Sequence, residues 1–122
     1  RYDLDLTIDV EKHRATLRER ITWTNHTKIP ANHLAFNFYP NYQVPRGDYL
    51  PLAKTLEMLR LQPSLGIDRG GRAGVISEAK LLTLAGKPLN QVLRYEYDDT
   101  NPTALRFPLP KPLEPGETVS VE

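Results

Sequence analysis

The sequence contains no cysteine, which excludes a disulfide scaffold, a thiolate zinc site and a cysteine nucleophile. It also lacks any apolar run near the length of about 20 residues that a membrane-spanning helix needs. Neither sign of charge dominates, because 16 Lys and Arg stand against 15 Asp and Glu, for a net charge of +1. We therefore expect no nucleic-acid partner and no membrane span.

The 122 residues are enough for one domain with a modest core, and we expect a single β-sandwich domain over residues 1–122. Eleven prolines indicate many turns and strand ends. Both ends of the sequence fall within alternating apolar and polar runs. From these runs we expect a domain excised from a longer protein.

Alternating residues predict two strands near the N-terminus, joined as an antiparallel hairpin. Residues 2–10 place apolar side chains on one face and polar side chains on the other, and residues 15–24 repeat the pattern after a polar connection. Glu19 falls on the apolar face, where it needs a bulge, a sheet edge or a buried cation. We expect four apolar residues of this region and the next strand to be buried together: Leu6, Trp23, Phe36 and Phe38.

Shorter alternating runs predict further strands over residues 34–39, 75–84, 92–97, 103–109 and 118–121. Leucines at helical spacing predict one short helix over residues 51–61, with proline at its start and another beyond its end. The glycine-rich residues 65–73 are expected to be mobile. About seven to eight strands with regular turns indicate an all-β fold, an antiparallel, saddle-like sandwich with this helix inserted.

No group of residues composes an active site, so we assign no catalytic, cofactor-binding or metal-binding residues. The histidines lie outside a His-Glu-x-x-His motif and lack a third ligand: His13, His26 and His33. The serines lie outside a nucleophile elbow: Ser64, Ser77 and Ser120. The glycines match no phosphate-binding loop: Gly66, Gly70, Gly71 and Gly74.

Two other patterns also have structural explanations. Three aspartates and two arginines share the polar face of the predicted hairpin, where their charges can offset one another: Asp3, Asp5, Asp9, Arg18 and Arg20. We interpret them as a solvated face rather than a calcium or acid–base site. Asn25-His26-Thr27 fits the glycosylation sequon, a short pattern that is common by chance.

Four stretches follow one another along the chain: YDLDLTID at 2–9, RERITWTN at 18–25, LAFNFYPN at 34–41 and KPLEPGE at 111–117. In this order they resemble the N-terminal β-domain of the aminopeptidase-N-like zinc metallopeptidases, the gluzincins related to leukotriene A4 hydrolase. The resemblance covers most of residues 2–121. The helix at 51–61 and the glycine-rich segment after it look like an insertion.

The resemblance implies a domain that packs on a downstream catalytic domain of the same chain and helps shape the cleft for a peptide substrate. Zinc, its ligands and the catalytic glutamate would then lie in that catalytic domain. This chain alone would be neither an enzyme nor a cofactor-binding protein. The alternative is an independent Ig-like adhesion module or a carbohydrate-binding module.

A domain cut from a larger enzyme exposes the apolar face on which its neighbour docks. The candidates for this face are the helix over 51–61 and the loop around Tyr42 and Tyr49, because neither is needed to close the sandwich. We also expect an unpaired strand edge near Val119–Glu122.

Overall fold

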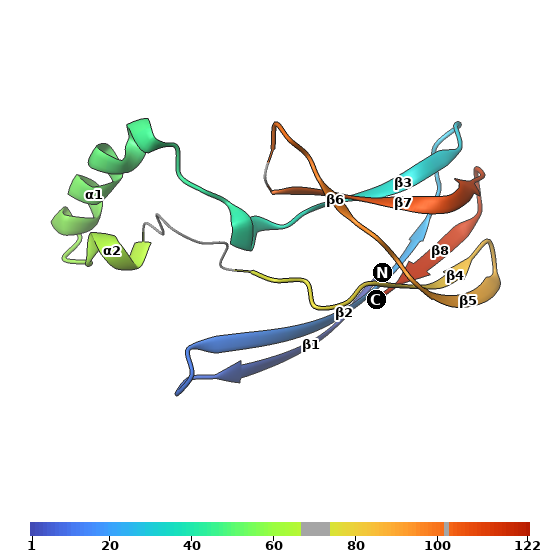
Figure 1. Ribbon diagram of the computed structural model, residues 1–122, viewed down its shortest axis with the longest axis horizontal. Helices are drawn as coiled ribbons and strands as arrows, with labels where there is room; N and C mark the ends of the chain where they lie inside the picture. Colours follow the sequence, from blue (N-terminus) through green and yellow to red (C-terminus); the bar gives the residue numbers. More distant parts are fainter. Residues whose placement is uncertain (67–73, 102) are drawn as a thin grey trace. The chain divides into compact units, whose positions relative to one another are not determined.

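A computed structural model describes residues 1–66, 74–101 and 103–122 of the chain. In these residues the fold is mostly β, with eight strands in two sheets, as the sequence predicts (Figure 1). The strands are β1 Tyr2–Asp9, β2 Arg14–Thr24, β3 Ala31–Asn37, β4 Lys80–Leu84, β5 Lys87–Val92, β6 Glu96–Tyr97, β7 Ala104–Leu113 and β8 Thr118–Val121. The all-β, sandwich-like fold class is thereby confirmed.

The chain divides into two compact units, which we describe separately. Unit 1 comprises Arg1–Leu34, Ile76–Tyr95 and Arg106–Glu122, and unit 2 comprises Ala35–Val75 and Glu96–Leu105. One sheet has five strands in the order β1-β2-β8-β4-β5, and the other has three in the order β3-β7-β6. The five-stranded sheet belongs to unit 1. No helix in the described part of the chain is long and apolar enough to cross a membrane.

Strand β8 lies at the centre of the five-stranded sheet. It pairs antiparallel with β2, from Ile21↔Val121 to Thr24↔Thr118, and on its other side with β4. The sequence-based expectation of an unpaired edge near Val119–Glu122 is therefore wrong. The edge strand on the β2 side of the sheet is β1. Its alternating run predicts a strand but does not indicate that this strand has a neighbour on one side only.

Strands β4 and β5 form a tight hairpin. Its turn consists of Ala85 and Gly86, both with positive φ, at 51° and 75°. Two such residues give the twist that a two-residue hairpin requires. Lys87 and Pro88 already belong to β5 and pair with Leu84 and Thr83 of β4, so this strand begins before residue 92, where the sequence pattern placed its start.

The core of unit 1 lies on strands that are far apart in the sequence. Its buried apolar side chains come mainly from β4, β7 and β8, and they are Leu34, Leu81, Leu84, Leu93, Phe107, Leu113, Val119 and Val121. The predicted core is only partly correct. Trp23, Phe36 and Phe38 are half-buried, whereas the side chain of Leu6 is 57% exposed because no element of unit 1 covers its face of β1.

The buried side chain of Asn25 joins three segments of unit 1. Its Nδ2 donates hydrogen bonds of 2.9 Å to the carbonyl oxygens of Ile29 and Leu113, and its Oδ1 accepts bonds from Thr27. Its backbone carbonyl accepts a bond from the N–H of Gly116, a residue in the left-handed region at φ 84°. Asn25 has no exposed surface, so this sequon residue has a structural role in the folded chain.

Unit 2 contains the helical segments, α1 over Tyr49–Met58 and α2 over Pro63–Gly66, and two 3₁₀ turns, η1 over Tyr39–Asn41 and η2 over Arg46–Asp48. Helix α1 begins two residues before the predicted helix and ends three residues before its predicted end. None of its residues is buried. The predicted mobility of the glycine-rich segment concerns residues 65–73, of which 67–73 lie outside the described residues.

Replacement of Asn25 by alanine should lower the free energy of unfolding by about 1–3 kcal/mol, because the Asn25→Ala variant removes the side-chain donor to the buried Leu113 carbonyl and the acceptor for the N–H of Thr27. Urea denaturation of the purified chain measures this loss. The matched control is Asn32→Ala, on an exposed position of β3, which should change stability by less than about 0.5 kcal/mol. Equal losses in the two variants would contradict the structural role of Asn25.

Candidate interaction surface

The hairpin of β1 and β2 extends beyond the rest of its sheet. The two strands pair without interruption from Tyr2↔Ile21 to Asp9↔Arg14, whereas β8 pairs with β2 only over Ile21–Thr24. Most of the hairpin is therefore a two-stranded ribbon, formed by residues 3–9 and 14–20 (Figure 1, dark blue). We call this segment the β1–β2 ribbon. A two-stranded ribbon without a covering layer is only marginally stable in water.

One face of the β1–β2 ribbon, continued by the strand ends beside it, is apolar and exposed. Its large side chains are all more than half exposed, from 52% for Leu17 to 78% for Val10, and they are Tyr2, Leu4, Leu6, Ile8, Val10 and Leu17. We call this set the apolar face. Contiguous apolar surface of this kind is unusual on a chain that works alone and marks interaction sites. The sequence pattern identified the face correctly but assigned it to the core.

Glu19 lies in the middle of this apolar face. It stands directly opposite Leu4 in the register, and Leu17 and Ile21 flank it along β2. The register is continuous through Glu19, so there is no bulge, and no ion pair involves this residue among the described parts of the chain. The register thus excludes the bulge, and β8 pairs with β2 over Ile21–Thr24, next to Glu19 along β2.

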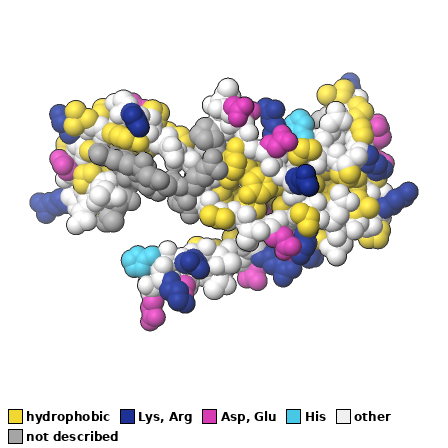
Figure 2. All heavy atoms as spheres, in the orientation of Figure 1, with side chains coloured by type: hydrophobic (Ala, Val, Ile, Leu, Met, Phe, Trp, Pro, Cys, Tyr) yellow, Lys and Arg dark blue, Asp and Glu magenta, His cyan; other side chains and the backbone are white. Residues whose placement is uncertain are grey.

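The opposite face of the β1–β2 ribbon is charged. Figure 2 shows basic and acidic side chains next to one another along the hairpin. Arg20 stands opposite Asp3 and Arg18 opposite Asp5, as the sequence suggested. However, both guanidinium groups bond to Glu122, at 2.8 Å from Arg18 and 3.1 Å from Arg20.

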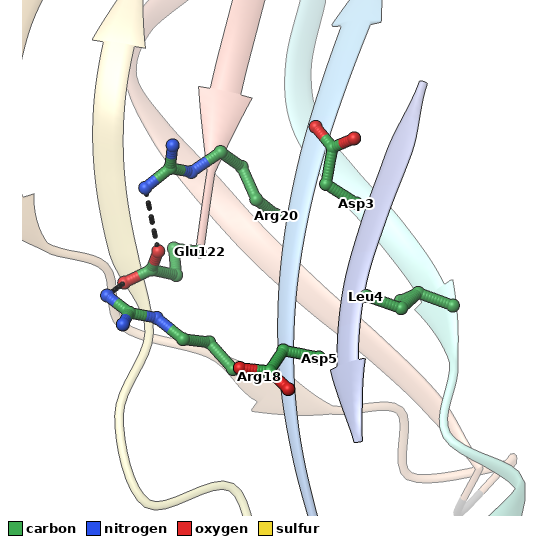
Figure 3. A pocket seen from close by; sticks show the side chains of 6 residues that line it. All are labelled: Asp3, Leu4, Asp5, Arg18, Arg20 and Glu122. Atoms are coloured by element: carbon green, nitrogen blue, oxygen red, sulfur yellow. Dashed lines mark hydrogen bonds and ion pairs between the residues drawn. The ribbon is translucent and has the colours of Figure 1, made fainter.

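Figure 3 shows how these side chains lie. Arg18 and Arg20 reach across from β2 to the carboxylate of Glu122, and the side chains of Asp3 and Asp5 take no part in these ion pairs. Together with Leu4, these residues line an open depression. The aspartates at the ends of β1 have local partners instead: Asp3 pairs with Arg1 and Asp9 pairs with Lys12, each at 2.9 Å.

The two arginines change the proton affinity of Glu122. The hydrogen bond from Arg18, reinforced by that from Arg20, lowers the pKa of the Glu122 carboxyl below its ordinary value of 4.5. In turn, the hydrogen bond to Glu122 raises the pKa of Arg18. These two ion pairs join the end of the chain after β8 to β2.

The residues that the sequence raised as possible ligands or nucleophiles do not come together. His13 lies in the hairpin turn, His26 in a loop and His33 on β3, all exposed. Ser64 is exposed on α2, and Ser120 is half-buried on β8. The described residues contain no group of three or more His, Cys, Asp or Glu side chains that could hold a metal ion.

Unit 2 contains a buried amide, that of Asn41, which the sequence did not indicate. Asn41, only 2% exposed, donates a hydrogen bond of 2.9 Å from Nδ2 to the hydroxyl of Tyr97. Its Oδ1 has no partner in the described structure. In the sequence, the Pro40-Asn41 pair indicated only a strand end, since a buried amide cannot be told from a turn amide by residue type.

Comparisons of the chain with protein-family models, with curated proteins and with solved structures find no match.

Removal of Arg18 should raise the pKa of Glu122 toward 4.5, and removal of Arg20 should do so to a smaller extent, because Arg18 makes the shorter and stronger bond. NMR titration of the Glu122 carboxyl carbon in Arg18→Gln and Arg20→Gln measures both changes. The control is Arg14→Gln, on the same face beside Asp9, which should leave the Glu122 titration unchanged.

The sign of the effect on stability follows from the lowered pKa. Glu122 is easier to ionise in the folded chain than in the unfolded chain, so its contribution to stability is present above about pH 4.5 and disappears as the pH falls through the lowered value. Arg18→Gln should therefore reduce the acid dependence of unfolding. A titration of Glu122 that is identical with and without Arg18 would contradict this assignment.

Proposed function

We propose that this chain is the non-catalytic N-terminal β-domain of an aminopeptidase-like zinc metallopeptidase, which packs on a catalytic domain and helps shape the peptide-binding cleft. Two lines support the proposal. The first is the resemblance of four sequence stretches, in order, to that family. The second is the all-β, sandwich-like architecture, in which two of the four stretches lie in β1 and β2 and the other two begin in β3 and β7.

The observation that carries the docking role is the exposed apolar face. The alternation along β1 and β2 is as regular as that of a half-buried strand, yet the residues it places inward are exposed in the folded chain. A sequence that maintains apolar positions in register along a two-stranded ribbon encodes a covered face. In this proposal the cover is the catalytic domain.

In this proposal the chemical step belongs entirely to the catalytic domain. Zinc and its ligands, together with the catalytic glutamate, reside there, and this chain contributes a rigid wall and a docking face. The proposed chemistry of this chain is binding, and the peptide substrate meets it only in the assembled enzyme. Helix α1 and the loop around Tyr42 remain further candidates for interdomain surface, since Leu50, Met58 and Tyr42 are exposed.

The test uses the 122-residue chain and the proposed catalytic domain, expressed separately and mixed. Isothermal titration calorimetry should detect binding, and Leu6→Asp should weaken it at least about tenfold, because a carboxylate would then be buried in the interface. The matched control is Val92→Asp, an exposed apolar residue on β5 at the other end of the sheet order, which should bind as the unmodified chain does.

Two results would contradict the proposal. One is the absence of binding between the two domains under conditions in which both are folded. The other is binding of the unmodified chain to an immobilised glycan panel without any peptidase domain, which would favour the independent carbohydrate-binding module.

A further inference from the structure

The apolar face of the β1–β2 ribbon carries one charge, and that charge restricts what can cover it. The neighbours of Glu19 within the ribbon are all apolar: Leu4 across the ribbon, Leu17 and Ile21 along β2, and Tyr2 and Leu6 on the diagonals. Any covering layer that removes water from these residues also removes it from Glu19. A buried carboxylate without a partner is strongly unfavourable.

Among the described residues, no cation pairs with Glu19. The nearest basic side chains on β2 are Arg18 and Arg20, and the pleat directs both to the other face, where they bind Glu122. No ion pair of the Glu19 carboxylate occurs in this part of the chain. A layer that covers the face and brings its own cation would supply the pairing that these residues lack.

A second copy of the chain is a poor cover for the same reason. Stacked face to face, the second copy would present the same apolar side chains and another Glu19, but no Lys or Arg, since the paired positions of this face are Tyr2, Leu4, Leu6, Ile8, Ala15, Leu17, Glu19 and Ile21. Two carboxylates would then be buried and no cation. This arrangement of charge disfavours self-association through the apolar face.

We propose that the partner covering this face is a protein surface with a single Lys or Arg at the centre of an apolar patch, and that this cation pairs with Glu19. This inference rests on the proposed docking function and specifies the chemistry of the docked surface. Arginine suits the position better than lysine, because its planar guanidinium can bind a carboxylate through two parallel hydrogen bonds. Glu19 thus selects the partner by charge, and the apolar side chains around it supply the contact area.

A charge-swap selection tests this inference and does not require the partner to be identified. The probe is a displayed library of random peptides, selected separately against the unmodified 122-residue chain and against Glu19→Lys. Peptides that bind the unmodified chain should carry a basic residue between apolar ones, and those that bind Glu19→Lys should carry an acidic residue there. Glu11→Lys, which makes the same charge change in the hairpin turn, is the matched control and should select the same peptides as the unmodified chain.

Binding measurements on one selected peptide quantify the preference. Replacement of its central basic residue by glutamate should weaken binding to the unmodified chain by about tenfold or more and should strengthen binding to Glu19→Lys. Thermal unfolding of each variant verifies that it is folded. Leu6→Asp should abolish binding of the selected peptide altogether.

The remaining outcomes separate this inference from the proposal on which it rests. Peptides that require Leu6 but show no charge preference would overturn the role of Glu19 and leave the docking face intact. Peptides that bind equally well to Leu6→Asp would overturn both. A dimer in sedimentation velocity that Leu6→Asp dissociates would also overturn the inference, because the cover would then be a second copy.

Discussion

A two-stranded ribbon pairs each strand on one side only and buries little apolar surface, and these two limits determine the stability of the N-terminal hairpin. The β1–β2 ribbon has one charged face and one apolar face. Strand β8 pairs with β2 only over Ile21–Thr24, so it does not lie beside the ribbon. The base of the hairpin is held firmly, because β8 pairs with β2 on one side and with β4 on the other, and Glu122 bonds to two arginines of β2. The stability of the β1–β2 ribbon itself depends on what covers the apolar face.

Much of the fold can be read from the sequence where alternation is regular. Strands β1, β2 and β8 match the predicted runs within a residue or two, because their neighbouring apolar positions are uninterrupted by glycine or proline. Strand β7 was predicted to end at Leu109 and in fact continues to Leu113, through Pro110 and Pro112. Its neighbour β6 has only two residues, so most of β7 has a neighbouring strand on one side only, where proline is tolerated.

The candidate surface was harder to predict than the strands that compose it. Alternation separates the two faces of a strand, but it does not say whether the apolar face meets a core or a partner, and Leu6 was therefore placed in the core. The ion pair of Arg18 with Glu122 joins residues 104 positions apart, and it depends on the sheet order β1-β2-β8, which no local pattern encodes. The buried roles of Asn25 and Asn41 escaped prediction because a polar residue near a proline is typical of a turn.

Hydrogen exchange of the unmodified chain tests most directly whether the apolar face lacks a cover. If it does, the amides of Asp5, Thr7 and Arg18, which bond across the ribbon, should exchange through local opening, with protection far below that of Val119 and Val121 in β8. NMR measures the two groups of amides in one sample. Equal protection of ribbon and β8 amides would contradict this account, because the ribbon would then be as stable as the core without any partner.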